Sequence, residues 1–232
     1  MTDAVPKSDV PSSLYDYIGV SDAEAWAEAR TVEASAVDWG ALNDAAAQDA
    51  DHAAEVFAKG PAGALLREAA EANAEAVCEA LLMNELVVSE EEIQDALRTA
   101  VEADSAAAVA VLVQGGASPN DQLNSGVRLL HHAAAAGADS VVHALLQGDA
   151  YVHQRDDAEY TPLHRAVMAD AEATVRRLLD AGADVQMRTA DGRSALHLAV
   201  AHNAARVIPV LIAGKARRNQ KDDAGYTPLH RA

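Results

Sequence analysis

Large aromatic side chains are scarce in this sequence of 232 residues, which has two tryptophans, five tyrosines and one phenylalanine. A core without them has to be filled by smaller side chains, and alanine occurs 55 times. Alanine is the strongest helix former and has the smallest apolar side chain that can be buried. We therefore expect closely packed helices rather than a sheet.

Cysteine and long apolar segments are also lacking. Cys78 is the only cysteine, so no intrachain disulfide can form, and we expect it to be an inert core residue. No apolar run approaches the roughly 18 to 20 residues that a membrane span needs. The first residues, MTDAVPKSDVPSS, have neither the basic nor the apolar region of a secretory signal. We expect a soluble, cytoplasmic monomer that does not insert into membranes.

Basic residues are few in the N-terminal half. Residues 1–123 carry 24 acidic and 5 basic side chains, whereas residues 124–232 carry 12 and 13, and the net charge of the chain is −18. Nucleic acid is disfavoured as a partner, because a phosphate backbone requires a basic surface. Two interpretations of the acidic half remain open: a solvated surface that keeps the chain soluble, or a platform for a basic partner protein.

Motifs of enzymes and metal sites are absent from the sequence. It contains no phosphate-binding G-x-x-x-x-G-K-[ST], no G-x-G-x-x-G, no H-E-x-x-H and no G-x-S-x-G. Histidines outside the repeat described below lack the spacing of zinc ligands. We predict no catalytic residue, no cofactor and no metal, and hence no enzyme activity.

One pattern is strongly present: leucine, histidine and alanine recur every 33 residues. It runs through the stretches GVRLLHHAA, EYTPLHRAV, GRSALHLAV and GYTPLHRA. Upstream, Leu97 and Ala100 continue it, and Arg98 stands in place of the histidine. A fixed period of this length predicts stacked copies of one helical unit, since one unit cannot bury its apolar face alone. The members are Leu130, Leu163, Leu196, Leu229; His131, His164, His197, His230; and Ala133, Ala166, Ala199, Ala232.

A second series marks a turn inside each unit. Asp104, Gly137, Asp170 and Asn203 are also 33 apart, and all three residue types tolerate a left-handed backbone. A turn between two helices needs such a residue just after the first helix ends.

The same template extends upstream at shorter intervals, which gives a division of the whole chain. We predict a tail with a capping helix over 1–38 and a repeat array over 39–232. The array comprises degenerate repeats 39–60, 61–90 and 91–123, clear repeats 124–156, 157–189 and 190–222, and an incomplete repeat 223–232.

Within a unit, the sequence predicts a short helix over about 160–169 and a second over about 171–181. Thr161 can cap the first of these helices, and Pro162 suits its first position. In the unit over 190–222, Pro209 is expected to remove a hydrogen bond and kink the second helix. Gly148 and Gly214 come one residue earlier than Gly182 does, so we expect the helices before them to be one residue shorter.

The stretches YTPLHRAV, GYTPLHRA and LLDAGADV, with their period of 33, resemble the ankyrin-repeat family. This resemblance implies an all-α solenoid of stacked antiparallel helix pairs, with short β-hairpin-like fingers between repeats. It also implies that the repeated histidine is structural and bonds to the adjacent threonine and to backbone of the neighbouring repeat. Arg128 occupies the threonine position before His131, which breaks that pair.

The resemblance further implies a non-catalytic protein-interaction module, an adaptor or scaffold, with a concave binding surface of finger tips and first helices. Tyrosine and arginine are favoured anchors of such surfaces, although Tyr160 and Tyr226 could equally pack between fingers. The candidate contact residues are Arg155, Asp157, Tyr160, Met168, Arg188, Asp191, Arg193, His202 and Tyr226.

An alternative is that the array is the regulatory or targeting end of a longer enzyme, channel or multidomain chain. The last unit, DAGYTPLHRA, stops about one turn into its first helix, and the preceding helix is strongly apolar. From the sequence we therefore expect a fragment or truncated product.

Overall fold

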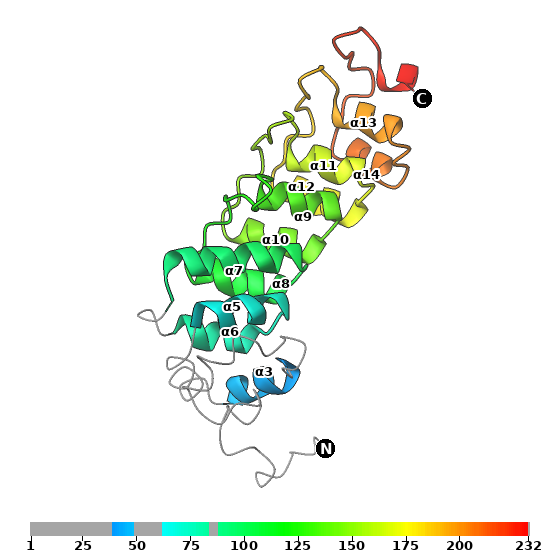
Figure 1. Ribbon diagram of the computed structural model, residues 1–232. Coiled ribbons are helices and arrows are strands. Elements are labelled where there is room, and N and C mark those ends of the chain that lie inside the picture. The colour runs from blue at the N-terminus through cyan, green and yellow to red at the C-terminus, as the bar shows by residue number, and fades with distance from the viewer. Residues whose placement is uncertain (1–38, 49–61, 84–87, 232) are drawn as a thin grey trace, which may run out of the picture.

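The fold is a stack of antiparallel helix pairs in two layers (Figure 1). The computed structural model describes residues 39–48, 62–83 and 88–231. The first helices of the pairs are α5 (Ala62–Glu71), α7 (Glu90–Glu102), α9 (Leu129–Ala136), α11 (Pro162–Met168) and α13 (Ala195–Ala201). The second helices are α6 (Glu75–Leu82), α8 (Ala106–Gln114), α10 (Asp139–Gln147), α12 (Glu172–Asp180) and α14 (Val207–Ala213). The described chain ends in a 3₁₀ turn, η2 (Pro228–Arg231).

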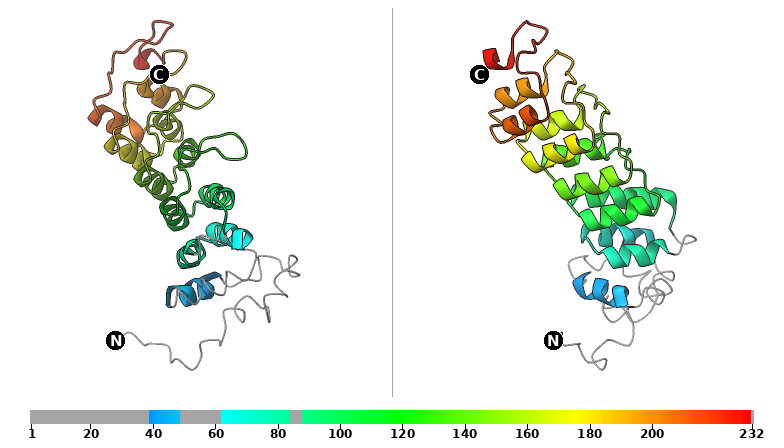
Figure 2. Two further views of the ribbon diagram at one scale, coloured as in Figure 1. Left: turned by 90° about the vertical axis from the view of Figure 1, so that its left-hand side faces the viewer. Right: turned by 180° about the vertical axis from the view of Figure 1, so that it is seen from behind.

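Each layer contains helices of one kind. First helices pack on first helices and second on second, and Figure 2 shows the two columns side by side with the connecting loops extending beyond the first helices. In the predicted repeat 39–60 the structure describes one helix, α3 (Trp39–Gln48), which packs on the second helix α6. The tail and capping helix expected over 1–38 lie outside the described residues. The repeat boundaries stay a prediction.

The 33-residue series forms the core. Leu97, Leu130, Leu163 and Leu196 are all buried, and the alanines three residues after each of them are fully buried. Small alanines let neighbouring helices approach closely, which is how the chain packs a core with few aromatic side chains. The all-helical repeat solenoid is therefore confirmed.

Left-handed residues end the first helices, as predicted. Gly137, Asp170 and Asn203 have φ of 72°, 50° and 53°, and Asn73 and Asp104 have 55° and 57°. The side chains of Asn73 and Asp170 also have a role that the sequence did not reveal: they cap the second helix of the next repeat. Asn73 Oδ1 accepts hydrogen bonds from the amides of Ala107 and Ala108, both at 3.1 Å.

Asp170 Oδ1 accepts from the amides of Arg206 and Val207, at 3.0 and 3.1 Å. Asn43, which lies within α3 and not at a left-handed turn, accepts in the same way from the amide of Ala76 through Oδ1, at 2.8 Å. Each bond satisfies an amide that the helix itself leaves without a partner. At Asn73 and Asp170, the turn of one repeat thus stabilises the second helix of the next repeat.

The prediction about Gly148 and Gly214 was wrong. Helix α10 has nine residues, like α12, and ends at the equivalent position. The left-handed residue follows one position later, at Asp149 and Lys215, in register with Gly182.

Close packing explains the earlier glycines. A Cβ on Gly148 would lie 2.1 Å from Val113 Cγ1, and one on Gly214 would lie 3.0 Å from Leu179 Cδ1. Gly115 is similarly placed, 2.6 Å from Leu82 Cδ1. These glycines let the ends of α8, α10 and α14 contact the preceding second helix.

The expected kink at Pro209 was also wrong. Helix α14 begins at Val207, so Pro209 lies in its first turn, where amides have no helical acceptor anyway. Compared with α12, which begins at Glu172, α14 starts two positions later in the repeat. The helix that contains the proline is therefore two residues shorter than α12, at its N-terminal end.

The fingers are tight turns and contain no strand among the described residues. Isolated β-bridges join Gln122 to Arg128 and Arg188 to Ser194. The amide of Thr189 donates to the carbonyl of Arg193 at 2.9 Å, and the other fingers repeat this bond. No helix in the described ranges is long and apolar enough to cross a bilayer.

Candidate functional site

The buried histidines are held by two sets of hydrogen bonds. Nδ1 of His164 accepts from the amide of Thr161 at 3.2 Å, so Nε2 carries the proton and donates to the carbonyl of Met187 at 3.1 Å. His197 repeats this arrangement with Ser194 and the carbonyl of Tyr226. Each imidazole therefore fixes a helix start and ties it to the following finger.

Two departures from the histidine pattern fit this structural role. Arg98, which replaces the histidine in its repeat, donates from Nε to the carbonyl of Gln122 at 3.0 Å. His131 donates to the carbonyl of Tyr160, but its buried Nδ1 has no partner. The reason is Arg128, which offers no hydroxyl at the cap position, as the sequence predicted.

Burial shifts the pKa of two histidines downward, because it disfavours the charged imidazolium. The pKa of His164 falls to about 4, and that of His131 is also lowered. Burial likewise raises the pKa of the Cys78 thiol to about 12, which leaves it protonated and unreactive. Within the described ranges no three His, Cys, Asp or Glu residues gather as metal ligands would.

The predicted contact residues Arg155 and Arg188 are engaged between the fingers. Arg155 donates to the carbonyl of Glu159 at 3.0 Å and to the carbonyl of Arg188 at 2.8 Å. Arg188 donates to the carbonyl of Gly192 at 2.7 Å and to that of Lys221 at 3.2 Å. Each arginine closes its own finger and bonds to the next, so these two side chains mainly hold the fingers in register.

The predicted residue Tyr160 belongs to a cluster that sequence reasoning missed. Asp156 accepts from the amide of Tyr160 at 2.9 Å and from Nε of Arg165 at 2.7 Å, and the Arg165 guanidinium lies 4.7 Å from the centre of the tyrosine ring. Burial pushes the pKa of Asp156 upward, but these hydrogen bonds outweigh it and hold the pKa below its usual value.

The same cluster recurs 66 residues later, where Asp222 and Arg231 surround Tyr226. A signal for it was present in the sequence. The aspartate and the arginine occur together in these two repeats, and in the repeat between them both are replaced, by Thr189 and Leu198.

The remaining candidates fall into two groups. Asp157, Asp191 and Arg193 lie on finger turns, with Asp157 exposed and Arg193 paired to Asp191 at 2.8 Å. Met168 and His202 lie at the opposite ends of α11 and α13, about 10 Å away along helices of seven residues. The finger residues therefore lie on the side of the array where the first helices begin. Met168 and His202 lie on the side where these helices end.

Comparison with known proteins agrees with this architecture. The family model for ankyrin repeats in three copies matches residues 97–189 and 163–232, which together cover more than half of the chain. No curated protein matches the chain.

Proposed function

Because the chain belongs to the ankyrin-repeat family, whose repeats generally serve as protein-interaction modules and are typically non-catalytic, we propose that it is an adaptor that binds a partner protein on its finger turns and first helices. Its role is to hold the partner and not to transform it.

The observation that carries this proposal is the hydrogen bonding between neighbouring fingers. Arg155 and Arg188 each bond to the carbonyl of a residue in the following finger, which holds the exposed groups on these turns in place. A surface that is ordered before binding loses less conformational entropy on association. The groups it offers include Asp157, Asp223 and Tyr226, and the last of these is 50% exposed.

The charge of the array favours a basic partner. In the described part of the N-terminal half, Arg67 pairs with Asp95, and Arg98 pairs with Asp95 and Asp121. Many carboxylates there are exposed, Glu71 and Glu102 among them. Complementary charge speeds encounter with a basic surface and makes binding sensitive to salt.

Affinity capture followed by quantitative mass spectrometry tests the proposal. Partners of the 232-residue chain are compared with those of the double variant Asp157→Lys, Tyr226→Ala, which changes only exposed side chains on the fingers. Glu79→Lys, an exposed change on α6 in the other layer, is the control. We expect specific partners to be lost from the finger variant and kept by the control. Full retention by the finger variant would overturn the proposal.

A further inference from the structure

Three hollows meet in the layer of second helices, at the C-terminal end of α10. One of about 450 Å³ lies between α10 and α12, one of about 440 Å³ lies between α8 and α10, and one of about 720 Å³ lies beside the loop after α10. Shared lining residues show that the three hollows are adjacent to one another. We call the combined depression the α10 groove, and the residues shared between its parts are Leu146, Gln147, Asp149 and Ala181.

A sequence difference marks the hollow between α10 and α12. Gly115, Gly148 and Gly214 follow α8, α10 and α14, and a Cβ at each would lie within 3.0 Å of a side chain from the preceding second helix. Ala181 stands at the equivalent end of α12 and does carry a Cβ. Leu146 of α10 occupies the repeat position of Val113 and Leu179, which lie against Gly148 and Gly214. Its side chain lines the hollow beside Ala181.

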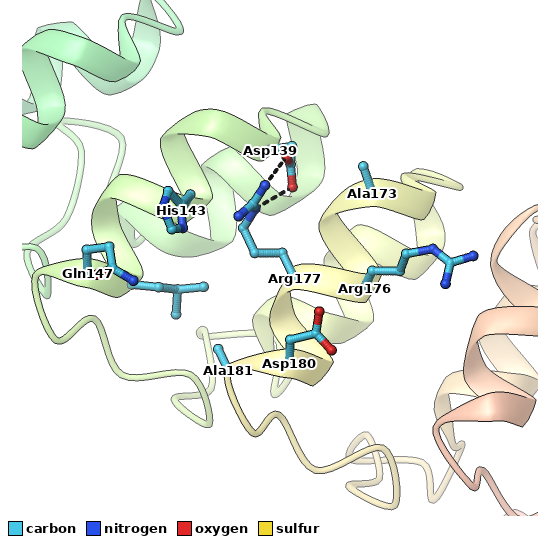
Figure 3. A pocket seen from close by; sticks show the side chains of 9 residues that line it. Asp139, His143, Gln147, Ala173, Arg176, Arg177, Asp180 and Ala181 are labelled. Atoms are coloured by element: carbon cyan, nitrogen blue, oxygen red, sulfur yellow. Dashed lines mark hydrogen bonds and ion pairs between the residues drawn. The ribbon is translucent and has the colours of Figure 1, made fainter.

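The groove has an apolar floor and one closed side. Leu146 and Ala181 supply the apolar surface. Figure 3 shows Arg177 reaching from α12 to Asp139 on α10, where its Nε and terminal nitrogen donate to the two carboxylate oxygens at 2.6 and 2.5 Å. This bidentate pair spans the space between the two helices and neutralises both charges.

The charge left at the groove is negative. Arg177 is paired with Asp139, and Arg176 is paired with Glu172 at 2.9 Å. Asp149 and Asp180 are exposed, and neither forms an ion pair within the described residues. Beside them, Tyr151 is 63% exposed, and its ring can pack against an aliphatic chain or the face of a guanidinium.

We propose that the α10 groove binds a basic, partly apolar segment of a partner protein. A lysine or arginine of that segment is attracted to Asp149 and Asp180, and a neighbouring apolar side chain covers Leu146 and Ala181. Tyr151 provides the aromatic contact that commonly anchors an interface. The site lies in the layer opposite the first helices and does not depend on the proposed binding role of the fingers.

Fluorescence anisotropy with two defined peptides tests this site in the 232-residue chain. The first is a labelled dodecapeptide of arginine, lysine and leucine, and the second has glutamate and aspartate in place of the bases. At pH 7.5 and moderate salt we expect the basic peptide to bind and the acidic peptide not to bind. Binding of both peptides alike, or of neither, would overturn the proposal.

Variants locate the binding. Asp149→Asn with Asp180→Asn keeps side-chain shape and removes both charges, and we expect at least a tenfold rise in Kd. Tyr151→Ala is expected to raise Kd severalfold. Asp157→Asn, an equally conservative change on a finger, should leave Kd unchanged and serves as the matched control.

Amide chemical shifts give an independent check. We expect the peptide to shift the resonances of Leu146, Gln147, Tyr151 and Ala181. An unchanged Kd in the double variant, or shifts confined to the fingers, would contradict the assignment. The two proposals can fail separately. If the finger variant loses partners in the capture experiment but the basic peptide does not bind the 232-residue chain, the finger proposal stands and the groove proposal is overturned.

Discussion

At the scale of single residues, the imidazoles carry out a task for which their chemistry is suited. A neutral histidine offers one acceptor and one donor on opposite sides of a rigid ring. In this chain the acceptor holds the helix start and the donor reaches the next finger, as His164 shows with Thr161 and Met187. A row of such residues resembles a metal site only in sequence.

This arrangement predicts a pH dependence of stability. The folded state keeps His164 neutral down to about pH 4, whereas the unfolded chain takes up the proton near pH 6.5. Stability is therefore fully present above pH 6.5 and falls as the pH drops toward 4, by about 1.4 kcal/mol for each pH unit per such histidine.

Urea unfolding at pH 7 and pH 5 measures this effect. We expect a lower midpoint at pH 5 in the wild type and a smaller drop in His164→Gln, which is already less stable at pH 7. Equal midpoints at both pH values in the wild type would show that protonation of the buried histidines does not destabilise the fold.

The unpaired Nδ1 of His131 predicts a stabilising substitution. Arg128→Thr places a hydroxyl where Thr161 has one in the next repeat, and so supplies both a helix cap and a partner for the imidazole. A cap of this kind is worth about 1 kcal/mol, or about 2 to 4 °C in Tm for a chain of this size.

Differential scanning calorimetry is the measurement, with Thr161→Val as the reverse change. We expect Tm to rise in the first variant and fall in the second. An unaltered Tm in Arg128→Thr would mean that Nδ1 of His131 already has a partner.

At the scale of elements, the finger turns share one backbone requirement. Gly126, Gly192 and Gly225 have positive φ at the same position of three fingers, and Glu159 occupies it in the fourth with φ of 62°. A side chain with a Cβ is disfavoured there by about 1 kcal/mol. The loop after α14 has a similar substitution, since Lys215 has φ of 67° where the equivalent residue after α12 is Gly182.

Replacing these residues with glycine should stabilise the protein. Glu159→Gly relieves the backbone but loses an exposed ion pair with Arg155 at 3.1 Å, so we expect a gain of about 0.5 kcal/mol. The Lys215 side chain forms no ion pair within the described residues, so Lys215→Gly should raise the free energy of unfolding by more than Glu159→Gly does. Guanidinium unfolding ranks the two variants, and a lower midpoint in both would refute the strain argument.

The elements also show how far sequence reasoning reaches. The period, the paired helices and the left-handed turns were predictable, because each follows from residue types repeated at fixed positions. The early glycines and Pro209 were misjudged because their meaning depends on where a helix begins and what lies against its end. The hollow between α10 and α12 was not predictable, because it depends on how Ala181 of one repeat lies relative to Leu146 of another.

At the scale of the whole molecule, the stack is unequal along its length. Leu229 is 83% exposed, whereas Leu196, its counterpart one repeat earlier, is 4% exposed. Ile208 is half-buried where Val175 and Val142 are fully buried. In an array whose repeats contact only their neighbours, lower burial means lower local stability.

Hydrogen exchange of the 232-residue chain should reveal this gradient. We expect amides of α14 and η2 to exchange faster than those of α9 to α12, because fewer apolar contacts have to break for them to open. Equal protection of amides from exchange across residues 129–213 would contradict the predicted gradient of stability.

The caps that cross between repeats have a consequence for biosynthesis. Asn43, Asn73 and Asp170 precede the helices they cap by 33 to 37 residues, so each acceptor leaves the ribosome before its donor. Translation at about 5 to 20 residues per second takes seconds to add one repeat, whereas a helix forms within about a microsecond. The helices α6, α8 and α14 therefore emerge after the residues that cap them, whereas the bonds of His164 and Arg155 to the following finger have to wait until the next repeat has been made.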